Sequence, residues 1–102
     1  MAKLLVLYKT PKDAAAFDKY YFDTHVGLAK KIPGLRKYEI SQGAVASPAG
    51  ASGVHLVALL QFDSMAALQT ALGSPEGQAA AGDLSNFASG GVDLLLFDTR
   101  EL

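Results

Sequence analysis

The chain has 102 residues, of which 50% are hydrophobic and 19% are charged, and its formal net charge is −1. This composition is typical of one folded domain, assigned here to residues 1–102, and it provides no basic field for nucleic acid or anionic lipid. The absence of cysteine excludes disulfides, thiolate metal sites and thiol nucleophiles. The N-terminal apolar run is shorter than the roughly 18 residues of a membrane span and carries no signal-peptide cleavage site, so we expect a cytoplasmic protein.

The first predicted elements are a strand and a helix. Lys3–Lys9 encloses an apolar run between two lysines, which is typical of a central strand that is apolar on both faces. Thr10 then serves as a predicted helix cap, with Pro11 at the first helical position. We expect this helix to run to about Lys31, because Pro33-Gly34 stops it.

The rest of the chain predicts three more strands and a second helical region. Leu35–Gln42 alternates as a half-exposed edge strand does, whereas Val54–Phe62 is apolar nearly throughout and is predicted to be central. Between them, the small residues of Gly43–Gly53 predict a loop that is the most mobile segment apart from the termini. Ser64 caps a short helix that is interrupted at Gly73, Ser74-Pro75-Glu76 starts the helix again, and Val92–Phe97 forms the last strand.

The order of these elements is β-α-β-β-α-β. It predicts an α+β, ferredoxin-like fold with a four-stranded antiparallel sheet, in which the two most apolar strands are central. The helices cover one face of this sheet, and no predicted element remains to cover the other face. Because the strands are apolar on both faces, we expect a second copy to pack there and to form a homodimer with the architecture of a dimeric α+β barrel.

A histidine on the first helix is the main candidate for chemistry. At 100° per residue it shares the buried stripe of the helix, and an imidazole facing a sheet can act as acid, base or donor near neutral pH. The alternative interpretation is a core histidine whose nitrogens are satisfied by backbone or by a tyrosine. The stripe consists of Ala14, Phe17, Tyr21, His25, Leu28 and Ile32.

Aromatic residues on neighbouring elements extend this hypothesis. Such side chains either line a pocket for an apolar, oxygen-bearing ligand, between the first helix and the sheet, or form only a core. The residues assigned to substrate binding are Tyr8, Phe17, Tyr21 and Phe62, and Tyr38 joins His25 as a candidate catalytic residue.

No motif predicts a metal or another cofactor. His55 stands alone at the start of the third strand, and its role is open. The histidines have no ligand spacing, and no phosphate-binding glycine motif or serine-nucleophile elbow is present. Four acids, Asp63, Asp83, Asp93 and Asp98, end elements, where capping or solvation explains them.

The aromatic helix sequence Phe17–Ala29, followed by Ile32-Pro-Gly-Leu-Arg-Lys-Tyr38, resembles the signature of the EthD family of dimeric α+β barrels. Phe62–Leu68 and Ser74–Gly77 resemble the second helical region of that family, so the similarity covers almost the whole chain. The resemblance implies a link to ether degradation and to oxidative catabolism. Related methylmuconolactone isomerases use the same barrel for cofactor-free chemistry, and their helix histidine and following tyrosine match His25 and Tyr38 here.

The hypothesis that follows is a cofactor-free enzyme acting on a small, apolar, oxygenated metabolite. His25 would move a proton or hold a substrate oxygen, and Tyr38 would donate a hydrogen bond. Isomerisation, cyclisation, hydrolysis and oxygenation all fit these groups. The alternatives are a non-catalytic dimer that binds a metabolite or supports a neighbouring oxygenase, and a purely structural dimer. Residues 43–53 do not match the isomerases, so the resemblance does not supply the substrate.

Overall fold

A computed structural model describes all 102 residues and shows an antiparallel sheet of four strands in the order β2-β5-β1-β6. The most apolar strands, β1 and β5, lie at the centre of the sheet, and β2 and β6 form its edges. This arrangement confirms the predicted α+β, ferredoxin-like fold. The strands are β1 (Ala2–Lys9), β2 (Lys37–Ile40), β5 (Val54–Phe62) and β6 (Val92–Asp98).

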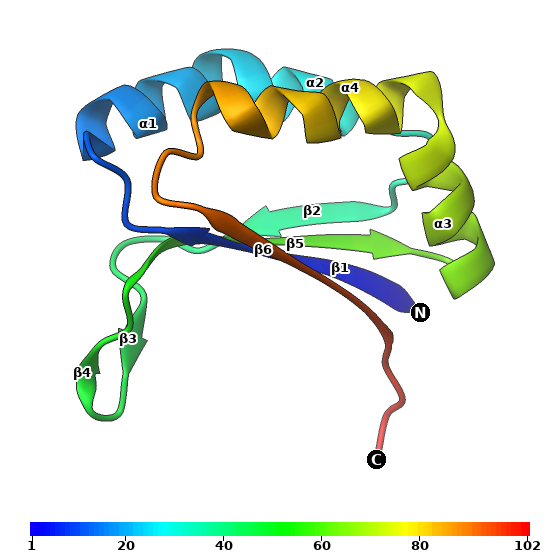
Figure 1. Ribbon diagram of the computed structural model, residues 1–102. Coiled ribbons are helices and arrows are strands. Elements are labelled where there is room, and N and C mark those ends of the chain that lie inside the picture. Colours follow the sequence, from blue (N-terminus) through cyan, green and yellow to red (C-terminus); the bar gives the residue numbers. More distant parts are fainter.

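The helices lie on one face of the sheet, apart from α3, which lies at one end (Figure 1). The core forms between this helical layer and the inward-pointing side chains of the strands, which on β1 are Ala2, Leu4, Val6 and Tyr8. The helical elements are α1 (Ala14–Tyr20), the π-helical turn η1 (Tyr21–His25), α2 (Val26–Lys30), α3 (Met65–Gly73), α4 (Pro75–Asp83) and the 3₁₀ turn η2 (Leu84–Asn86).

The first helix begins later than the sequence predicts. Asp13, not Thr10, is its cap: Asp13 is extended, and its Oδ1 accepts a hydrogen bond of 3.0 Å from the backbone N–H of Ala16. Thr10 instead donates its backbone N–H and its hydroxyl to the carbonyl oxygen of Gly53. The predicted start at Thr10 and Pro11 is therefore wrong by a turn, because Thr10 is used to hold the loop that precedes β5.

A π turn in the first helix keeps four residues on one face. Phe17, Tyr21, His25 and Ala29 are all buried although they are spaced by four residues, which would advance each by about 40° around a regular α-helix. The backbone N–H of Val26 donates to the carbonyl oxygen of Tyr21, five residues back. This wider turn corrects the drift, and π turns of this kind are frequent at functional sites.

The second helical region follows the predicted caps. The hydroxyl of Ser64 accepts from the N–H of Ala67, and the hydroxyl of Ser74 accepts from the N–H of Gly77, each at 3.0 Å. Gly77 also permits a close approach of α4 to α3, because a Cβ there would collide with the carbonyl oxygen of Ala71. With this close contact between α3 and α4, α4 lies over the sheet beside α2 (Figure 1).

The predicted loop at residues 43–53 contains a small hairpin. Its strands, β3 (Ala46–Ser47) and β4 (Gly50–Ala51), pair only with each other, and they project from the side of the sheet that carries no helix (Figure 1). The turn is made possible by Gly50, whose φ is +121°. The expectation of an irregular loop is thus wrong for these four residues, whereas its predicted mobility stays a prediction.

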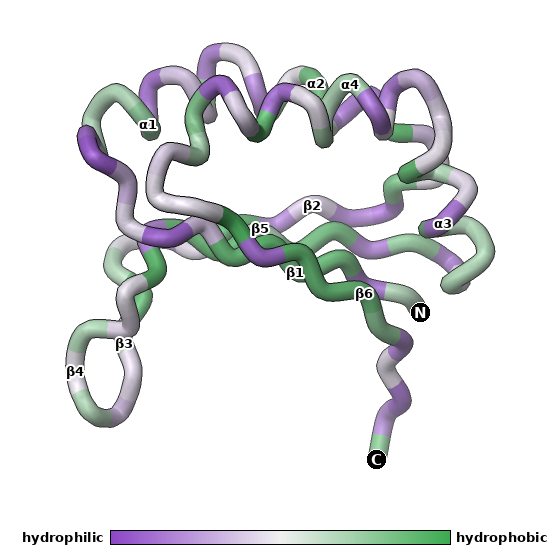
Figure 2. The backbone as a smooth tube through the Cα atoms, viewed as in Figure 1, coloured by the Kyte–Doolittle hydropathy of each residue, from purple (hydrophilic) through white to green (hydrophobic).

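No element covers the other face of the sheet (Figure 1), and its strands β1, β5 and β6 consist largely of hydrophobic residues (Figure 2). Leu5 lies between Leu59 and Leu95 in one cross-strand row, and Leu7 lies between Val57 and Asp93 in the next. The strand β6 is exposed on both faces, with Leu94 at 46% on the helix side and Leu95 at 49% on the outer side. An apolar surface of this kind is typical of a protein interaction site.

Candidate functional site

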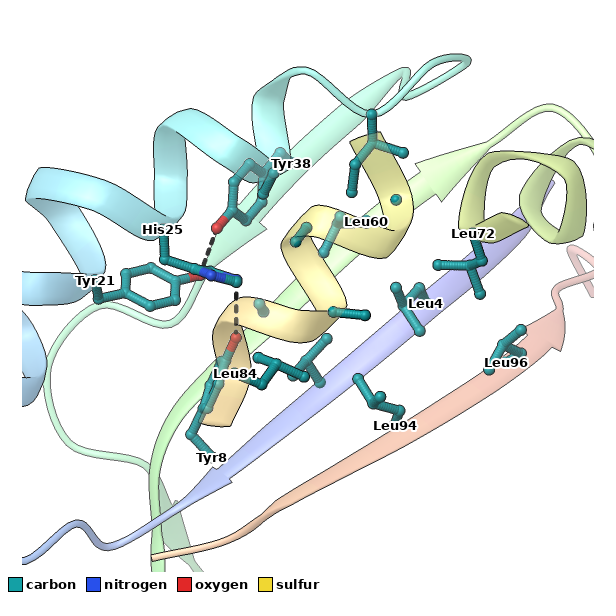
Figure 3. Close-up of a pocket in the computed structure, with 17 residues that line it drawn as sticks. Leu4, Tyr8, Tyr21, His25, Tyr38, Leu60, Leu72, Leu84, Leu94 and Leu96 are labelled. Atoms are coloured by element: carbon teal, nitrogen blue, oxygen red, sulfur yellow. Dashed lines mark hydrogen bonds between the residues drawn. The ribbon is translucent and has the colours of Figure 1, made fainter. Parts of the chain in front are cut away.

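A cavity of about 80 Å³ lies between the helices and their own sheet (Figure 3). Fifteen of its 17 lining residues are hydrophobic, and they come from all four main strands, from η1 and α2, and from α3, α4 and η2. Its polar atoms gather at one end, where it is lined by His25, Tyr8, Tyr21 and Tyr38. The cavity therefore combines an apolar body with one polar end, which is the usual design of a small-molecule site.

The ring of His25 stands at this polar end and is almost fully buried, with 5% of the residue exposed. Its Nδ1 lies 3.0 Å from Oδ2 of Asp83, at the end of α4. Its Nε2 lies 3.4 Å from the hydroxyl of Tyr8, which is long compared with the usual 2.7–3.2 Å of a good hydrogen bond. One nitrogen is thus held firmly, and the other is held loosely at the cavity.

Asp83 is buried beneath His25 and is itself held by two more donors. Its Oδ1 accepts from the hydroxyl of Tyr20 at 2.6 Å and from the side-chain amide of Asn86 at 2.9 Å. Burial acts to raise the pKa of Asp83, but the hydrogen bonds from Tyr20, Asn86 and His25 outweigh it and place the pKa below its ordinary value. The carboxyl group is therefore ionised at neutral pH.

An ionised Asp83 fixes the tautomer of the neutral imidazole. A carboxylate can only accept hydrogen bonds, so Nδ1 of His25 carries the proton that joins them. The lone pair of Nε2 then accepts the hydrogen of Tyr8 or of a ligand group in the cavity. His25 is positioned as a base or acceptor, with its acceptor atom on the cavity side.

Two tyrosines form the second polar pair of the cavity. The hydroxyls of Tyr21 and Tyr38 lie 2.5 Å apart and join η1 to the edge strand β2. Burial is the largest cause that raises the pKa of Tyr21, with the neighbouring Tyr38 adding to it, and burial also raises the pKa of Tyr38. Both hydroxyls are therefore neutral hydrogen-bonding groups over the physiological range.

The opposite end of the cavity is made of leucines and opens at the edge of the sheet. Leu94 and Leu96 line it from β6, and Leu72 lines it from α3 (Figure 3). The two β6 leucines remain 46% and 40% exposed while facing the cavity. A ligand can therefore enter at this edge and place its polar group against His25.

The structure brings together some of the residues predicted for the site and separates others. Four of the residues that the sequence analysis proposes for the site line one cavity, namely Tyr8, Tyr21, His25 and Tyr38. Phe17 lies behind it, edge-on to Tyr8 with ring centroids 5.3 Å apart. Phe62 is fully buried below Gly34. Phe17 and Phe62 therefore support the walls without lining the cavity.

Sequence reasoning missed the residues behind the imidazole. Asp83 was explained as a helix-end residue, yet it is 58 residues from His25 in sequence and bonds to it directly. Tyr20 and Asn86 complete this arrangement, and Phe87 packs on the ring of His25 at a centroid distance of 4.7 Å. The spacing Asp83-x-x-Asn86 after a helix resembles ordinary capping, so only the fold could reveal its role.

His55 lies outside the cavity. A β-bulge leaves it between the pairs Tyr8–Leu56 and Lys9–Val54, and its Nε2 lies 2.8 Å from Oδ1 of Asp18 on α1. The pair borders a separate, open hollow that is also lined by the exposed side chain of Phe22. His55 therefore joins a strand to a helix.

The chain contains no group of three or more histidine, cysteine, aspartate or glutamate side chains that could hold a metal ion. None of its helices has both the length and the apolar character that crossing a membrane demands.

Fold and site together define a ferredoxin-like α+β protein with an apolar cavity that ends in a histidine and three tyrosines. Residues 9–91, which make up most of the chain, match the model of the EthD domain. The chain belongs to the EthD family.

Two other proteins are similar to this chain at substantial identity. An uncharacterized 11.0 kDa protein encoded in the thcB-thcC intergenic region of Rhodococcus erythropolis is 40% identical over 99 residues, covering 96% of this chain and 94% of that protein. The crystal structure of an EthD family protein from Bacillus halodurans is 38% identical, with a TM-score of 0.90, and covers 98% of this chain and 99% of that one.

More distant structures share the fold alone. SnoaB from Streptomyces nogalater, a cofactor-independent oxygenase, is 17% identical with a TM-score of 0.66, covering 99% of this chain and 94% of that one. A dimeric ferredoxin-like protein from Thermobifida fusca is 14% identical with a TM-score of 0.68, covering 96% and 90%. Dimeric proteins are thus among the structural neighbours of this chain.

Proposed function

We propose that this protein is a cofactor-independent enzyme that acts on a small, largely apolar, oxygenated metabolite. The substrate lies in the cavity under the helices, with its oxygen at the polar end, and His25 transfers a proton or holds the oxygen. One observation carries the proposal: His25, whose Nε2 is held only loosely by the hydroxyl of Tyr8, lines the same otherwise apolar cavity as the hydrogen-bonded pair Tyr21–Tyr38.

The size of the cavity limits the substrate. A volume of about 80 Å³ is smaller than the roughly 150 Å³ engineered cavity that takes up benzene, and far below the 300 Å³ or more of pockets for drug-sized ligands. The enclosed part of a substrate is therefore a group of only a few atoms. Any larger part extends past Leu94 and Leu96, where the cavity opens.

The support behind His25 favours catalysis over mere packing. A base works best when a second group fixes its tautomer and orientation, and Asp83 meets that need from a position that the cavity does not reach. Asp83 is fixed in turn by Tyr20 and Asn86. A histidine that only filled the core would gain nothing from an acceptor nitrogen at the cavity.

The relatives are consistent with more than one reaction. The cofactor-independent oxygenase SnoaB has a similar fold, and the name of the EthD family protein from Bacillus halodurans refers to ethyl tert-butyl ether. The rival proposal is a dimeric module that binds the metabolite without converting it, for instance in support of an oxygenase. It uses the same cavity and predicts binding without turnover.

The proposal is tested by measuring whether small molecules bind to the wild type and to a variant in which a larger side chain fills the cavity. Ala80 lines the cavity and is buried, whereas Ala79, beside it on α4, is exposed and does not. A small ketone, lactone, phenol and ether are titrated into the wild type, Ala80→Leu and Ala79→Leu, with methyl and amide shifts followed by NMR. We expect binding by the wild type and Ala79→Leu, and loss of at least about tenfold in affinity for Ala80→Leu.

Two outcomes contradict the proposal. Binding that is equally strong in Ala80→Leu places the ligand elsewhere on the protein. Absence of binding for every compound in the wild type removes the cavity as a ligand site and leaves His25 as a core residue.

A further inference from the structure

The hydroxyls at the polar end leave one hydrogen free. In the pair Tyr21–Tyr38 one hydroxyl donates to the other, and the structure gives neither oxygen a second protein partner. The hydroxyl that accepts therefore still has its own hydrogen to donate. Because burial holds the pKa of both groups above the ordinary value, this hydrogen stays in place at neutral pH. The pair offers a donor to an oxygen of the ligand.

Charge at the cavity selects against an anionic group. No lysine or arginine is among the 17 lining residues, and the ionised group nearest to the polar end is the carboxylate of Asp83, behind His25. A carboxylate or phosphate entering this cavity would lose its hydration without meeting a cation. The oxygen that the tyrosine pair binds is therefore part of an uncharged group.

A base and a donor at one end of a cavity suit one reacting group in particular. Nε2 of His25 can take a proton, and the Tyr21–Tyr38 pair can stabilise negative charge that develops on an oxygen. A C–H on the carbon next to an ether oxygen is not acidic, whereas a C–H on the carbon next to a carbonyl group is, because the enolate spreads its charge onto the oxygen. The complementary group is thus a carbonyl with a hydrogen on the neighbouring carbon.

Resting on the proposed function, we infer that the substrates are uncharged carbonyl compounds that can enolise, and that the protein transfers the proton α to the carbonyl. The C–H bond breaks, its proton goes to Nε2 of His25, and its electron pair forms the C=C bond of the enolate. The carbonyl oxygen takes the negative charge and accepts the hydrogen bond of the tyrosine pair. Return of the proton to the same or another carbon regenerates neutral His25 and completes an exchange or an isomerisation.

Hydrogen exchange tests this step without knowledge of the natural substrate. Cyclopentanone is incubated with the protein in deuterated buffer, and the loss of its α-proton signal is followed by NMR. Tetrahydrofuran, a ring of the same size with an ether oxygen, and cyclopentanecarboxylate, an anion, are used as matched compounds for binding. We expect cyclopentanone and tetrahydrofuran to bind with the oxygen at the polar end and the ring extending toward the opening at Leu94 and Leu96. Cyclopentanecarboxylate should bind at least about tenfold more weakly, and only the ketone should exchange.

Variants then show which side chains the hydrogen exchange requires. We expect His25→Gln to reduce the protein-dependent exchange rate about a hundredfold or more, and Tyr21→Phe or Tyr38→Phe to reduce it to a similar extent. His55→Gln removes the other histidine, which lies outside the cavity, and should exchange like the wild type. Ala80→Leu keeps every polar group and should lose exchange because the ketone no longer enters, which covers the case in which His25→Gln fails to fold.

The two proposals fail in different ways. Cyclopentanone seated in the cavity without accelerated exchange overturns the enolisation step and leaves the cavity as a ligand site. Exchange that is as fast in His25→Gln as in the wild type overturns it equally. Failure of all three compounds to bind contradicts the proposed function itself.

Discussion

Asp83 Oδ2 and His25 Nδ1 lie 3.0 Å apart in the buried layer between α4 and the first helix, although 58 residues separate them in sequence. The carboxylate stands on the side of the ring that faces away from the cavity, so it sets the tautomer of His25 without competing for the ligand. Asp83 is accordingly a positioning residue, and its removal should affect stability and chemistry in ways that can be measured separately.

Asp83→Asn should remove a pH-dependent part of the stability. The pKa of Asp83 is lowered in the folded protein, so its contribution is present above the unfolded pKa of about 4 and is lost as the pH falls through the lower folded pKa. At neutral pH we expect the variant to unfold with about 1–3 kcal/mol less free energy than the wild type. Urea unfolding near pH 7 and near pH 3 should show this gap shrinking in acid. A gap that stays constant would mean that Asp83 is not ionised in the fold.

The tyrosines should resist ionisation until the protein unfolds. The pKa of each of the four is raised: by burial first in Tyr8, Tyr21 and Tyr38, and by the hydrogen bond to Asp83 first in Tyr20. Raised values give stability that is fully present below the unfolded pKa of about 10 and is lost as the pH rises above it. Tyrosinate absorbance and circular dichroism should therefore change together in one alkaline transition. Tyrosinate forming near pH 10 with an unchanged fold would count against the buried hydroxyl cluster.

The uncovered face of the sheet should bind a second copy. Leu5 is at the centre of that face, between Leu59 and Leu95, and a charge there would be buried without a partner in a face-to-face dimer. We expect the wild type to sediment at twice its 10.7 kDa mass at micromolar concentration, and Leu5→Glu to shift toward the monomer. Ala15→Glu, on the exposed side of α1, is the matched control and should remain dimeric. A monomeric wild type would contradict the dimer.

Most of the fold was predictable because local signals and hydrophobic periodicity agree with it. The apolar runs at residues 3–9 and 54–62 became the central strands β1 and β5, and Ser64 and Ser74 cap the helices that they were predicted to cap. The start of the first helix was mispredicted because both Thr10 and Asp13 are good caps. Tertiary contact decided between them, since Thr10 bonds to Gly53, which is remote in sequence.

Local sequence patterns predicted the residues of the site that line the cavity, but not those that support His25 from behind. His25 and Tyr21 follow from the helical stripe, and Tyr8 and Tyr38 follow from strands that pack against it. The position of Asp83 depends on how α4 crosses the sheet, which no periodicity encodes. The π turn was also hidden, because the geometry of a regular helix already places Tyr21 and His25 on one face.

The ring nitrogens of His25 provide the most direct test of the central claim, that Nε2 is the atom offered to a ligand in the cavity. Nitrogen NMR of the wild type, recorded with the ring neutral and with and without cyclopentanone, resolves Nδ1 and Nε2. We expect the proton on Nδ1 in both states, because Asp83 accepts it, and a shift of Nε2 when the ketone binds. A proton on Nε2, or a bound ketone that leaves Nε2 unchanged, would contradict the account.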